Sequence, residues 1–515
     1  MRVLMLGWEY PPHISGGLGT ACEGLTRALA RQGVEIDFIV PHLFGKEDAP
    51  HMRLIDPSVL AKEVGVAGPG PVANFPRQGT SESSEQTAIR FIERLVAKTV
   101  SPGSPEAEKA ASPTEAVTEE ADGRIRFLRV PSFLSPYLGV PPDTVIRKRD
   151  NLFRRHPARQ RFAPDGTPLA PTPEDVFVQQ LETVEERLPP LIRAMLPETL
   201  DEGPAADHYS DLFGEVGRFT ARVMALAQDR NYDVIHAHDW MTFPAAIALK
   251  ALTGLPLILH VHSLEYDRSG HGANWQIEQI EKEGIAAADT VIAVSYYTRS
   301  SISQRHGTSL DKIEVVHNGV YSKDTVDSYR RERDWPSKIV LFLGRVTFQK
   351  GPDYFVEAAA RVVPHVPDVL FVMAGSGDML PRMMDRVNEL GIGKNFLFTG
   401  FLKGPEVEKM FSMADCYVMP SVSEPFGLTA LEAISFNAPV IISRQSGVSE
   451  VLSHALKVNF WDVDQLANLI VSVLQYPELA QDISIMAGEE VRRLRWDAAA
   501  SKSIEVYGKT LARFS

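Results

Sequence analysis

Two carboxylates in an otherwise apolar stretch are the first residues whose types and spacing suggest chemistry. Glu424 follows a strand-like run, and Glu432 lies about a turn and a half into the helix expected next. An unpaired buried charge costs several kcal/mol, so each carboxylate must face water, a cation or a hydroxyl-rich ligand. Singly, Glu424 could complement the helix dipole and Glu432 could be a rim residue. Together, with Glu-Pro-Phe-Gly-Leu between strand and helix, they favour a grip on a polyhydroxylated ligand.

Anion-binding chemistry is predicted at two strand-to-helix turns. Arg345 and Lys350 flank the start of a helix, so two cations and free N–H groups converge there. The alternative for them is a surface salt-bridge pair. The glycines of Gly17-Leu18-Gly19 would let backbone N–H groups approach an anion near the N-terminus of the chain. Such glycine turns also occur without any ligand.

Polar residues end two predicted strands in the first half of the chain. Asp239 and His262 fall at the carboxyl ends of parallel strands, where folds of this kind bind ligands. A lone histidine is more often structural than catalytic. We expect His260 and His262 to face opposite sides of their strand, so that at most one points toward a ligand.

The elements that must position these residues alternate along the chain. Short apolar runs with strand character are separated by helical segments of 3.6-residue period. The predicted strands include 3–7, 34–41, 125–130, 256–262, 290–294, 312–316, 339–342, 369–374, 396–399, 416–420 and 440–442. This alternation predicts two doubly wound α/β domains.

Composition marks where the domains begin and end. We expect a first domain at 1–325, a second at 326–490 and a terminal helix at 491–515, with a charged linker near 321–336. Residues 62–122 are rich in Pro, Ser, Ala and Glu and predict a disordered insertion. A second insertion at 140–205 carries basic runs, which are either solvated surface or a patch that recognises an acceptor.

Bulk properties exclude several classes of function. The net charge of −13 argues against nucleic acid or an anionic membrane as the main partner. Only Cys22 and Cys416 are present, so no disulfide framework is expected and a reducing cytoplasm fits. No metal-binding spacing and no long apolar stretch occurs, so we expect neither a metal nor membrane insertion. The oligomeric state is left open.

The ordered set of motifs resembles a known family. The Gly16-Gly17-Leu18-Gly19 loop, Gly344-Arg345 with Lys350-Gly351, and Glu424 with Glu432 are similar to retaining glycosyltransferases of the GT-B fold, family 4. The segments HAHDW at 236–240, HVHSLEY at 260–266 and VVHNGV at 315–320 resemble its glycogen and starch synthase branch. The resemblance implies two Rossmann-like domains facing across a cleft, with the terminal helix packing back on the first.

That resemblance implies a role for each candidate catalytic residue. Arg345 and Lys350 would hold the diphosphate of a nucleotide sugar and stabilise the charge that develops on it. Glu424 would bind the sugar hydroxyls. His262 would contact the donor sugar near the reacting carbon, and Asp239 would organise the acceptor side. Retention would proceed by front-face attack, with the donor phosphate accepting the acceptor's proton.

The resemblance also implies a set of donor-binding residues, in which Glu432 would bind the ribose. The whole set is Gly17, Leu18, Gly19, Asn318, Gly344, Gly375, Phe401, Phe426, Gly427, Leu428, Thr429 and Glu432. Members of the fold usually need no metal and no cofactor. The co-substrate expected from the resemblance is ADP-glucose or UDP-glucose, and the other partner is a glycan acceptor.

Two departures from the family pattern affect the choice of substrate. Bacterial glycogen synthases usually carry Lys-Thr-Gly-Gly at the first loop, whereas this chain has Ile14-Ser15-Gly16-Gly17. They also tend to replace the second carboxylate, whereas Glu432 is present here. Both departures put bacterial glycogen synthesis in doubt. The alternatives are a lipid, sugar-phosphate or cell-surface glycan acceptor, or a non-catalytic nucleotide-sugar-binding protein.

Overall fold

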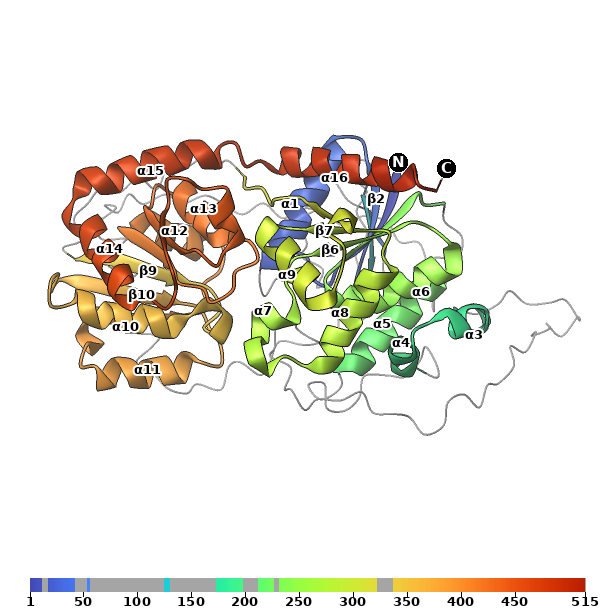
Figure 1. The fold of residues 1–515 in the computed structure, drawn as a ribbon, viewed down its shortest axis with the longest axis horizontal. Coiled ribbons are helices and arrows are strands. Elements are labelled where there is room, and N and C mark those ends of the chain that lie inside the picture. Colours follow the sequence, from blue (N-terminus) through green and yellow to red (C-terminus); the bar gives the residue numbers. More distant parts are fainter. Residues whose placement is uncertain are drawn as a thin grey trace, which may run out of the picture. The chain divides into compact units, whose positions relative to one another are not determined.

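A computed structural model describes residues 1–11, 17–41, 53–55, 125–129, 173–197, 212–226, 231–321 and 337–514. These residues divide into two compact units. The first contains the described residues up to Tyr321 together with Leu494–Ser515, and the second contains those from 337 to Arg493. Figure 1 follows the chain through both.

A parallel sheet of eight strands forms the centre of the first unit, in the order β3-β4-β2-β1-β5-β6-β7-β8. Both faces of such a sheet are covered by helices, so its strands are largely apolar. Its strands are β1 (Arg2–Leu6), β2 (Glu35–Val40), β3 (Arg53–Ile55), β4 (Ile125–Arg129), β5 (Val234–His238), β6 (Leu257–Val261), β7 (Thr290–Ala293) and β8 (Ile313–Val315). Strands β5 and β6 are wholly buried yet contain three histidines, which the apolar pattern does not explain.

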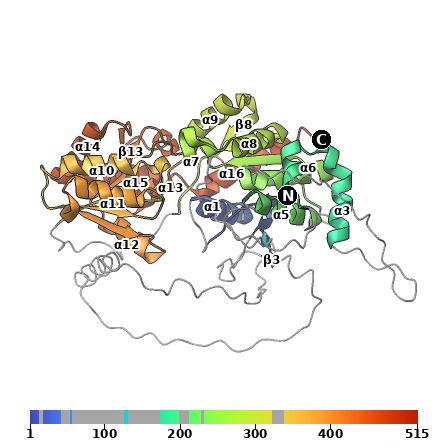
Figure 2. The ribbon, with the colours of Figure 1, turned by 90° about the horizontal axis from the view of Figure 1, so that it is seen from below.

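Helices from distant parts of the sequence cover this sheet. Helix α16, near the C-terminus, packs along α1, near the N-terminus, and both views show the two side by side (Figures 1 and 2). The helices of the unit are α1 (Gly17–Arg31), α3 (Pro173–Val184), α4 (Pro190–Met195), α5 (Leu212–Leu226), α6 (Phe243–Thr253), α7 (Glu265–Ser269), α8 (Trp275–Ala287), α9 (Tyr296–His306) and α16 (Trp496–Leu511). Because α16 reaches the sheet, the last residues of the chain help to build the interior of its first unit.

The second unit is a parallel sheet of six strands, in the order β11-β10-β9-β12-β13-β14. Its strands are β9 (Lys338–Leu343), β10 (Val369–Ala374), β11 (Phe396–Gly400), β12 (Cys416–Met419), β13 (Val440–Ser443) and β14 (Leu456–Val458). Strand order reverses beside β9, between β10 and β12. Open α/β sheets bind ligands at such a point, outside the carboxyl ends of the strands.

Helices lie on both sides of the second sheet, with α10 and α11 on one side and α12 and α13 on the other (Figure 1). They are α10 (Pro352–Val362), α11 (Leu380–Glu389), α12 (Pro405–Met413), α13 (Leu428–Ser435), α14 (Val463–Gln475) and α15 (Pro477–Val491). The core of the unit includes Phe355 and Phe371, whose rings meet edge to face at 5.5 Å. Apolar burial of this kind is the main force that stabilises the unit.

The predicted α/β class is confirmed, with each strand of the sequence-based list found within a few residues of its expected limits. The insertion expected at 140–205 is not wholly irregular, because α3 and α4 lie inside it and α3 packs on α5 and α6. The insertion at 62–122, the basic runs near 147–162 and the linker beyond Tyr321 lie outside the described residues.

Candidate active site

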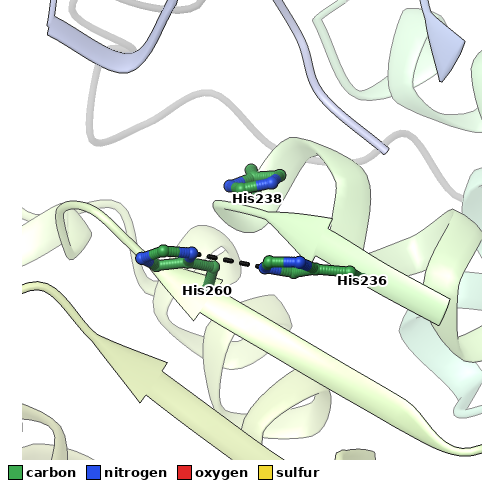
Figure 3. A group of neighbouring side chains, drawn as sticks. All are labelled: His236, His238 and His260. Carbon is green, nitrogen blue, oxygen red and sulfur yellow. Dashed lines mark hydrogen bonds between the residues drawn. The ribbon is translucent and has the colours of Figure 1, made fainter. Parts of the chain in front are cut away.

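Four imidazoles gather where β5 and β6 end. His236 and His238 lie two positions apart on β5. His260 of β6 pairs with His238, and His262 follows the end of β6. The rings of His236 and His238 are 4.4 Å apart, and those of His260 and His262 are 4.3 Å apart. Figure 3 shows three of the four rings lying nearly parallel. We call these four residues the histidine cluster.

The expectation that His260 and His262 face opposite sides was wrong. Side chains alternate along a strand with a period of two, so residues two positions apart point to the same face. The stacking of the two rings shows this directly. The spacing of two residues therefore already indicates that both rings lie on one face.

Hydrogen bonds join the histidine cluster into two pairs. His238 Nδ1 lies 2.9 Å from His262 Nε2, and His260 Nδ1 lies 3.3 Å from His236 Nε2 (Figure 3 draws the second pair). The second pair continues to the hydroxyl of Tyr507 on α16, 2.7 Å from His236 Nδ1. Burial lowers the pKa of His236 and of His262 to about 3, so both rings are neutral at pH 7.

Three members of the histidine cluster could in principle hold a metal ion, judged by the spacing of their ring nitrogens among the described residues. Ring nitrogens of His236, His238 and His260 lie within 4.8 Å of one another. A histidine ligand points a lone pair at the ion within its ring plane. Here the rings are nearly parallel, and both nitrogens of His236 are already hydrogen-bonded. The rings would have to turn before they could share an ion, so the expected absence of a metal stays a prediction.

Asp239 holds the loop that carries His262. Its Oδ1 accepts hydrogen bonds from the backbone N–H of His262 at 2.7 Å and of Ser263 at 3.3 Å. Its φ of 58° lies in the left-handed region, which is uncommon outside glycine and marks a constrained position. Burial raises the pKa of Asp239 to about 7, against the opposing effect of Arg268 and of the two backbone donors. The contacts of the Asp239 carboxylate are therefore with the backbone of the neighbouring loop.

A buried ion network supports the same loop from below. Arg268 contacts the carboxylates of Glu265 and Glu281 at 3.2 Å each, and it donates to the carbonyl of Ser263 at 3.1 Å. Glu281 also accepts from the backbone N–H of Glu265 at 2.7 Å. Sequence reasoning missed this network. The charged residues that follow HVHSL could have indicated it. They lie between two apolar elements, and charges that are buried there have to be paired.

The glycine loop at the start of α1 has an acidic neighbour inside the chain. The N–H of Gly19 donates to Glu9 Oε1 at 3.0 Å, and Glu9 is 6% exposed. Leu18 is buried, whereas Gly17 is exposed at the first position of the helix. The N–H of Gly19, which was predicted to face a phosphate, is thus already hydrogen-bonded to a carboxylate of the chain. Glu9 was not singled out from the sequence.

Asn318 is buried in the loop after β8, where the neighbouring Gly319 lies against the backbone of Trp496. It is part of the first unit, as are His262, Asp239 and the glycine loop. The remaining predicted site residues, from Gly344 to Glu432, belong to the second unit.

An ion pair joins the two turns that the sequence identified in the second unit. Lys350 Nζ lies 2.6 Å from Glu424 Oε2, although the two residues are 74 positions apart. Ser421 donates to the same carboxylate oxygen at 3.0 Å. Lys350 lies two residues before α10, and Glu424 lies in the loop between β12 and α13. The strand-order reversal beside β9 brings these loops together.

Arg345 is linked through Gln349 to the loop that carries Glu424. The Arg345 guanidinium donates to Gln349 Oε1 at 3.0 Å, and the carbonyl of Gln349 accepts from Val422 N–H at 2.9 Å. Gln349 is buried and was missed because its side chain carries no charge that requires a partner. Its position between two charged groups of one turn is the signal that could have found it.

Gly344 and Gly375 bring two strand ends into close contact. A Cβ on Gly375 would lie 1.8 Å from the carbonyl oxygen of Gly344, and its φ of 145° disfavours side chains. The N–H of Gly375 donates to the carbonyl of Gly400 at 2.8 Å, so it is engaged within the chain. Phe401, next along, is 55% exposed.

The start of α13 carries the remaining predicted donor-binding residues. Gly427 precedes the helix with a φ of 114°, beside the buried Phe426. Leu428 and Thr429 form the first turn and are half-buried. Thr429 Oγ1 lies 2.8 Å from the hydroxyl of Tyr417.

Tyr417 connects the two carboxylates with which the sequence argument began. Burial raises the pKa of Tyr417, and the charges of Glu424 and Glu432 raise it further. Glu432 is half-buried within α13. Both carboxylates therefore act on one buried hydroxyl, which carries its proton at neutral pH.

Comparison with known proteins gives consistent matches along the chain. The family model for glycosyl transferases group 1 matches residues 327–489, that for glycosyltransferase family 4 matches 197–323, and that for the starch synthase catalytic domain matches 2–78. No described helix has the length and apolar character needed to cross a bilayer.

Two relatives and one solved structure are reported for comparison. A glycosyltransferase of Methanocaldococcus jannaschii is 32% identical over 295 residues, which cover 54% of this chain and 75% of the relative. The glycogen synthase of Mycobacterium tuberculosis is 28% identical over 299 residues, covering 56% of this chain and 71% of the relative. Sucrose-phosphate synthase from Thermosynechococcus elongatus has a similar fold, with a TM-score of 0.60 over 99% of both chains at 18% identity.

Proposed function

Because this chain belongs to the family 4 glycosyltransferases of the GT-B fold, we propose that it moves a glucosyl unit from a nucleotide sugar to a glycan acceptor with retention of configuration. The observation that carries the proposal is the ion pair of Lys350 with Glu424 at the carboxyl end of the second sheet. In the proposed mechanism, Lys350 is the cation that holds a phosphate, and the neighbouring Glu424 accepts hydrogen bonds from sugar hydroxyls.

The chemistry of a leaving nucleotide diphosphate fits the charges at this edge. Negative charge develops on the diphosphate as the glycosidic bond breaks, and preorganised cations stabilise it most strongly at that stage. Lys350 and Arg345 supply these cations in the proposed mechanism. Lys350 is half-buried and its ammonium is held by Glu424, so little reorganisation is needed when the donor binds.

Glu424 and His262 receive different tasks in this proposal. The carboxylate of Glu424 accepts hydrogen bonds from hydroxyls of the donor sugar while it keeps Lys350 in place. The neutral ring of His262 is proposed to contact a hexosyl group near its reacting carbon. Asp239 influences the acceptor side through the loop that it holds, because its Oδ1 accepts from the backbone N–H groups of His262 and Ser263.

An α-glucan acceptor is favoured by the relatives. The chain is similar to a glycogen synthase over 56% of its own length, and residues 2–78 match the starch synthase model. Lipid, sugar-phosphate and cell-surface glycan acceptors are the alternatives that the test must separate. ADP-glucose and UDP-glucose are the proposed donors, and no metal or cofactor is proposed.

The test combines binding with product analysis. Thermal shifts are measured with ADP-, UDP- and GDP-glucose, and the donor that stabilises the protein is incubated with glycogen, maltose and sugar phosphates. We expect stabilisation by one glucose donor, and an α-linked product identified by NMR. Stabilisation without transfer to any acceptor would leave a nucleotide-sugar-binding protein, and no stabilisation by any donor would overturn the proposal.

A further inference from the structure

The histidine cluster contains two buried ring nitrogens without a partner. Nε2 of His238 and Nε2 of His260 are buried and make no hydrogen bond. The other nitrogen of each ring is engaged, His238 Nδ1 with His262 and His260 Nδ1 with His236. These two orphaned atoms decide where the protons of the cluster reside.

Each neutral imidazole carries one N–H and one lone pair. If the proton of His238 were on Nε2, a buried N–H would lack an acceptor, and such orphaned donors are rare and costly. If the proton is on Nδ1, only a lone pair is left unpaired, and the N–H donates to Nε2 of His262 over 2.9 Å. Burial lowers the pKa of His238 well below its ordinary value, which keeps this ring neutral.

The second pair obeys the same rule. A proton on Nδ1 of His260 donates to Nε2 of His236 and leaves only a lone pair on the buried Nε2. His236 must then carry its own proton on Nδ1, which donates to the Tyr507 hydroxyl at 2.7 Å. Both chains of hydrogen bonds therefore agree on one tautomer throughout the cluster.

His262 is the end of the first chain. Because its Nε2 accepts from His238, its own proton must be on Nδ1. This Nδ1 has no hydrogen-bond partner among the described residues and is not one of the buried unpartnered atoms. The backbone of His262 is fixed by Asp239, so the ring has little freedom to present its other edge.

We propose that His238 is a positioning residue, whose Nδ1–H donates to Nε2 of His262 and thereby fixes His262 as the tautomer that offers an Nδ1–H to the sugar. This rests on the proposed function for the identity of the ligand. The consequence is that His262 acts as a fixed hydrogen-bond donor to a hydroxyl or ring oxygen of the hexosyl group, and not as a general base.

The tautomer can be read without any substrate. Long-range ¹H–¹⁵N correlation spectra of the full-length protein with ¹⁵N-labelled histidine distinguish protonated from unprotonated ring nitrogens, and the His262→Asn variant assigns the signal. We expect His262 to show a protonated Nδ1 and a bare Nε2 at pH 7.5. A proton on Nε2 of His262 would overturn the proposal, whether or not the protein transfers sugar.

Two variants of His238 test the consequence for catalysis. The amide of His238→Asn can replace the Nδ1–H donor, whereas His238→Leu keeps bulk and removes the donor. We expect His238→Leu to lose about tenfold in kcat with a smaller change in KM, and His238→Asn to retain most of it. His238→Leu should also show His262 in mixed tautomers.

His260→Leu is the matched control, because His260 is as buried as His238 but is not hydrogen-bonded to His262. The tautomer of His262 should be unchanged in this variant, although its chemical shifts will move because the stacked ring of His260 is lost. If His238→Asn and His238→Leu lose equal activity with the His262 signal unaltered, the role of His238 is structural and the proposal fails. If the tautomer is as expected but no donor sugar binds, the proposed function fails while the assignment stands.

Discussion

Lys350 and Glu424 form the most informative contact at the scale of single residues. A buried ion pair contributes little to stability, because desolvation offsets its Coulomb attraction. Its presence at the carboxyl end of a sheet, with Ser421 as a third partner, is better explained by a task that requires both charges. This contact supports the proposal that Lys350 holds the phosphate of a nucleotide sugar while Glu424 accepts from its hydroxyls.

Replacing Lys350→Ala should reduce kcat by at least about a hundredfold, because the charge of the leaving group loses its main stabilising cation. Binding of the nucleoside diphosphate, measured by calorimetry, should weaken as well. Lys502→Ala removes an exposed lysine of α16 and serves as the control. Near-normal turnover in Lys350→Ala would show that the diphosphate binds elsewhere.

The carboxyl group of Asp239 should make stability depend on pH. Its pKa rises from 3.8 to about 7 on folding, so between these values the unfolded chain releases a proton that the native state keeps. The free energy of unfolding should therefore fall as the pH rises through this window, by up to about 1.4 kcal/mol per pH unit from this group. Urea titrations from pH 4 to 7 should show that Asp239→Asn lacks this contribution. Parallel pH profiles of the two proteins would contradict the raised pKa.

At the scale of elements, the close approach of two strand ends shapes the second unit. The loops after β9 and β10 touch at Gly344 and Gly375, which leaves no room for a side chain. The same turn continues into Arg345, whose guanidinium reaches Gln349. The contact of Gly344 with Gly375 therefore helps to position Arg345, which follows Gly344 in the chain.

The Gly375→Ala variant should lose at least about 2 kcal/mol of unfolding free energy, because its φ is unfavourable and its Cβ would overlap a carbonyl. Gly488→Ala, inside α15 with open space around it, should be neutral or stabilising by up to about 1 kcal/mol. Chemical denaturation of both variants checks this. Equal effects at the two sites would mean that the loop after β10 can relax.

At the scale of the whole molecule, the buried neutral histidines should make the stability of the fold depend on pH. The histidine cluster draws on β5, on β6 with the loop that follows it, and on the terminal helix through Tyr507. Protonating these rings requires the first unit to open, because the described residues place no counter-charge beside them and burial lowers their pKa.

Acid should therefore destabilise the protein. The pKa of His236 is about 3 in the folded state against 6.5 without burial, so the unfolded chain binds a proton that the native state excludes. Stability is fully present above pH 6.5 and declines as the pH falls toward 3. Four such rings outweigh the opposite slope from Asp239. Urea unfolding at pH 7.5, 6 and 5 should show this decline.

The His236→Phe variant should make the decline shallower, because it removes one of the buried rings that the unfolded chain protonates. His271→Gln, at an exposed position, should leave the slope unchanged. An acid slope in His236→Phe as steep as in the unaltered protein would mean that His236 is not among the groups that resist protonation.

The sequence by itself determined the α/β class, the approximate limits of the strands and the family. These depend on apolar periodicity and on turn residues within about ten positions of one another, which are local properties. It also predicted Lys350 and Glu424 as site residues, because each charge stood in a turn that leads from a strand into a helix. The facing of His260 and His262 was equally readable, since it follows from a period of two.

Only the tertiary structure decided which of these groups meet. The contacts of Glu9 with Gly19, of Tyr507 with His236 and of Lys350 with Glu424 all join residues that are far apart or carried on different elements. Such partners depend on strand order and helix packing, which no local pattern encodes. The tautomer assigned to His262 rests on the same kind of information, because it follows from the burial of Nε2 on His238 and not from either residue type.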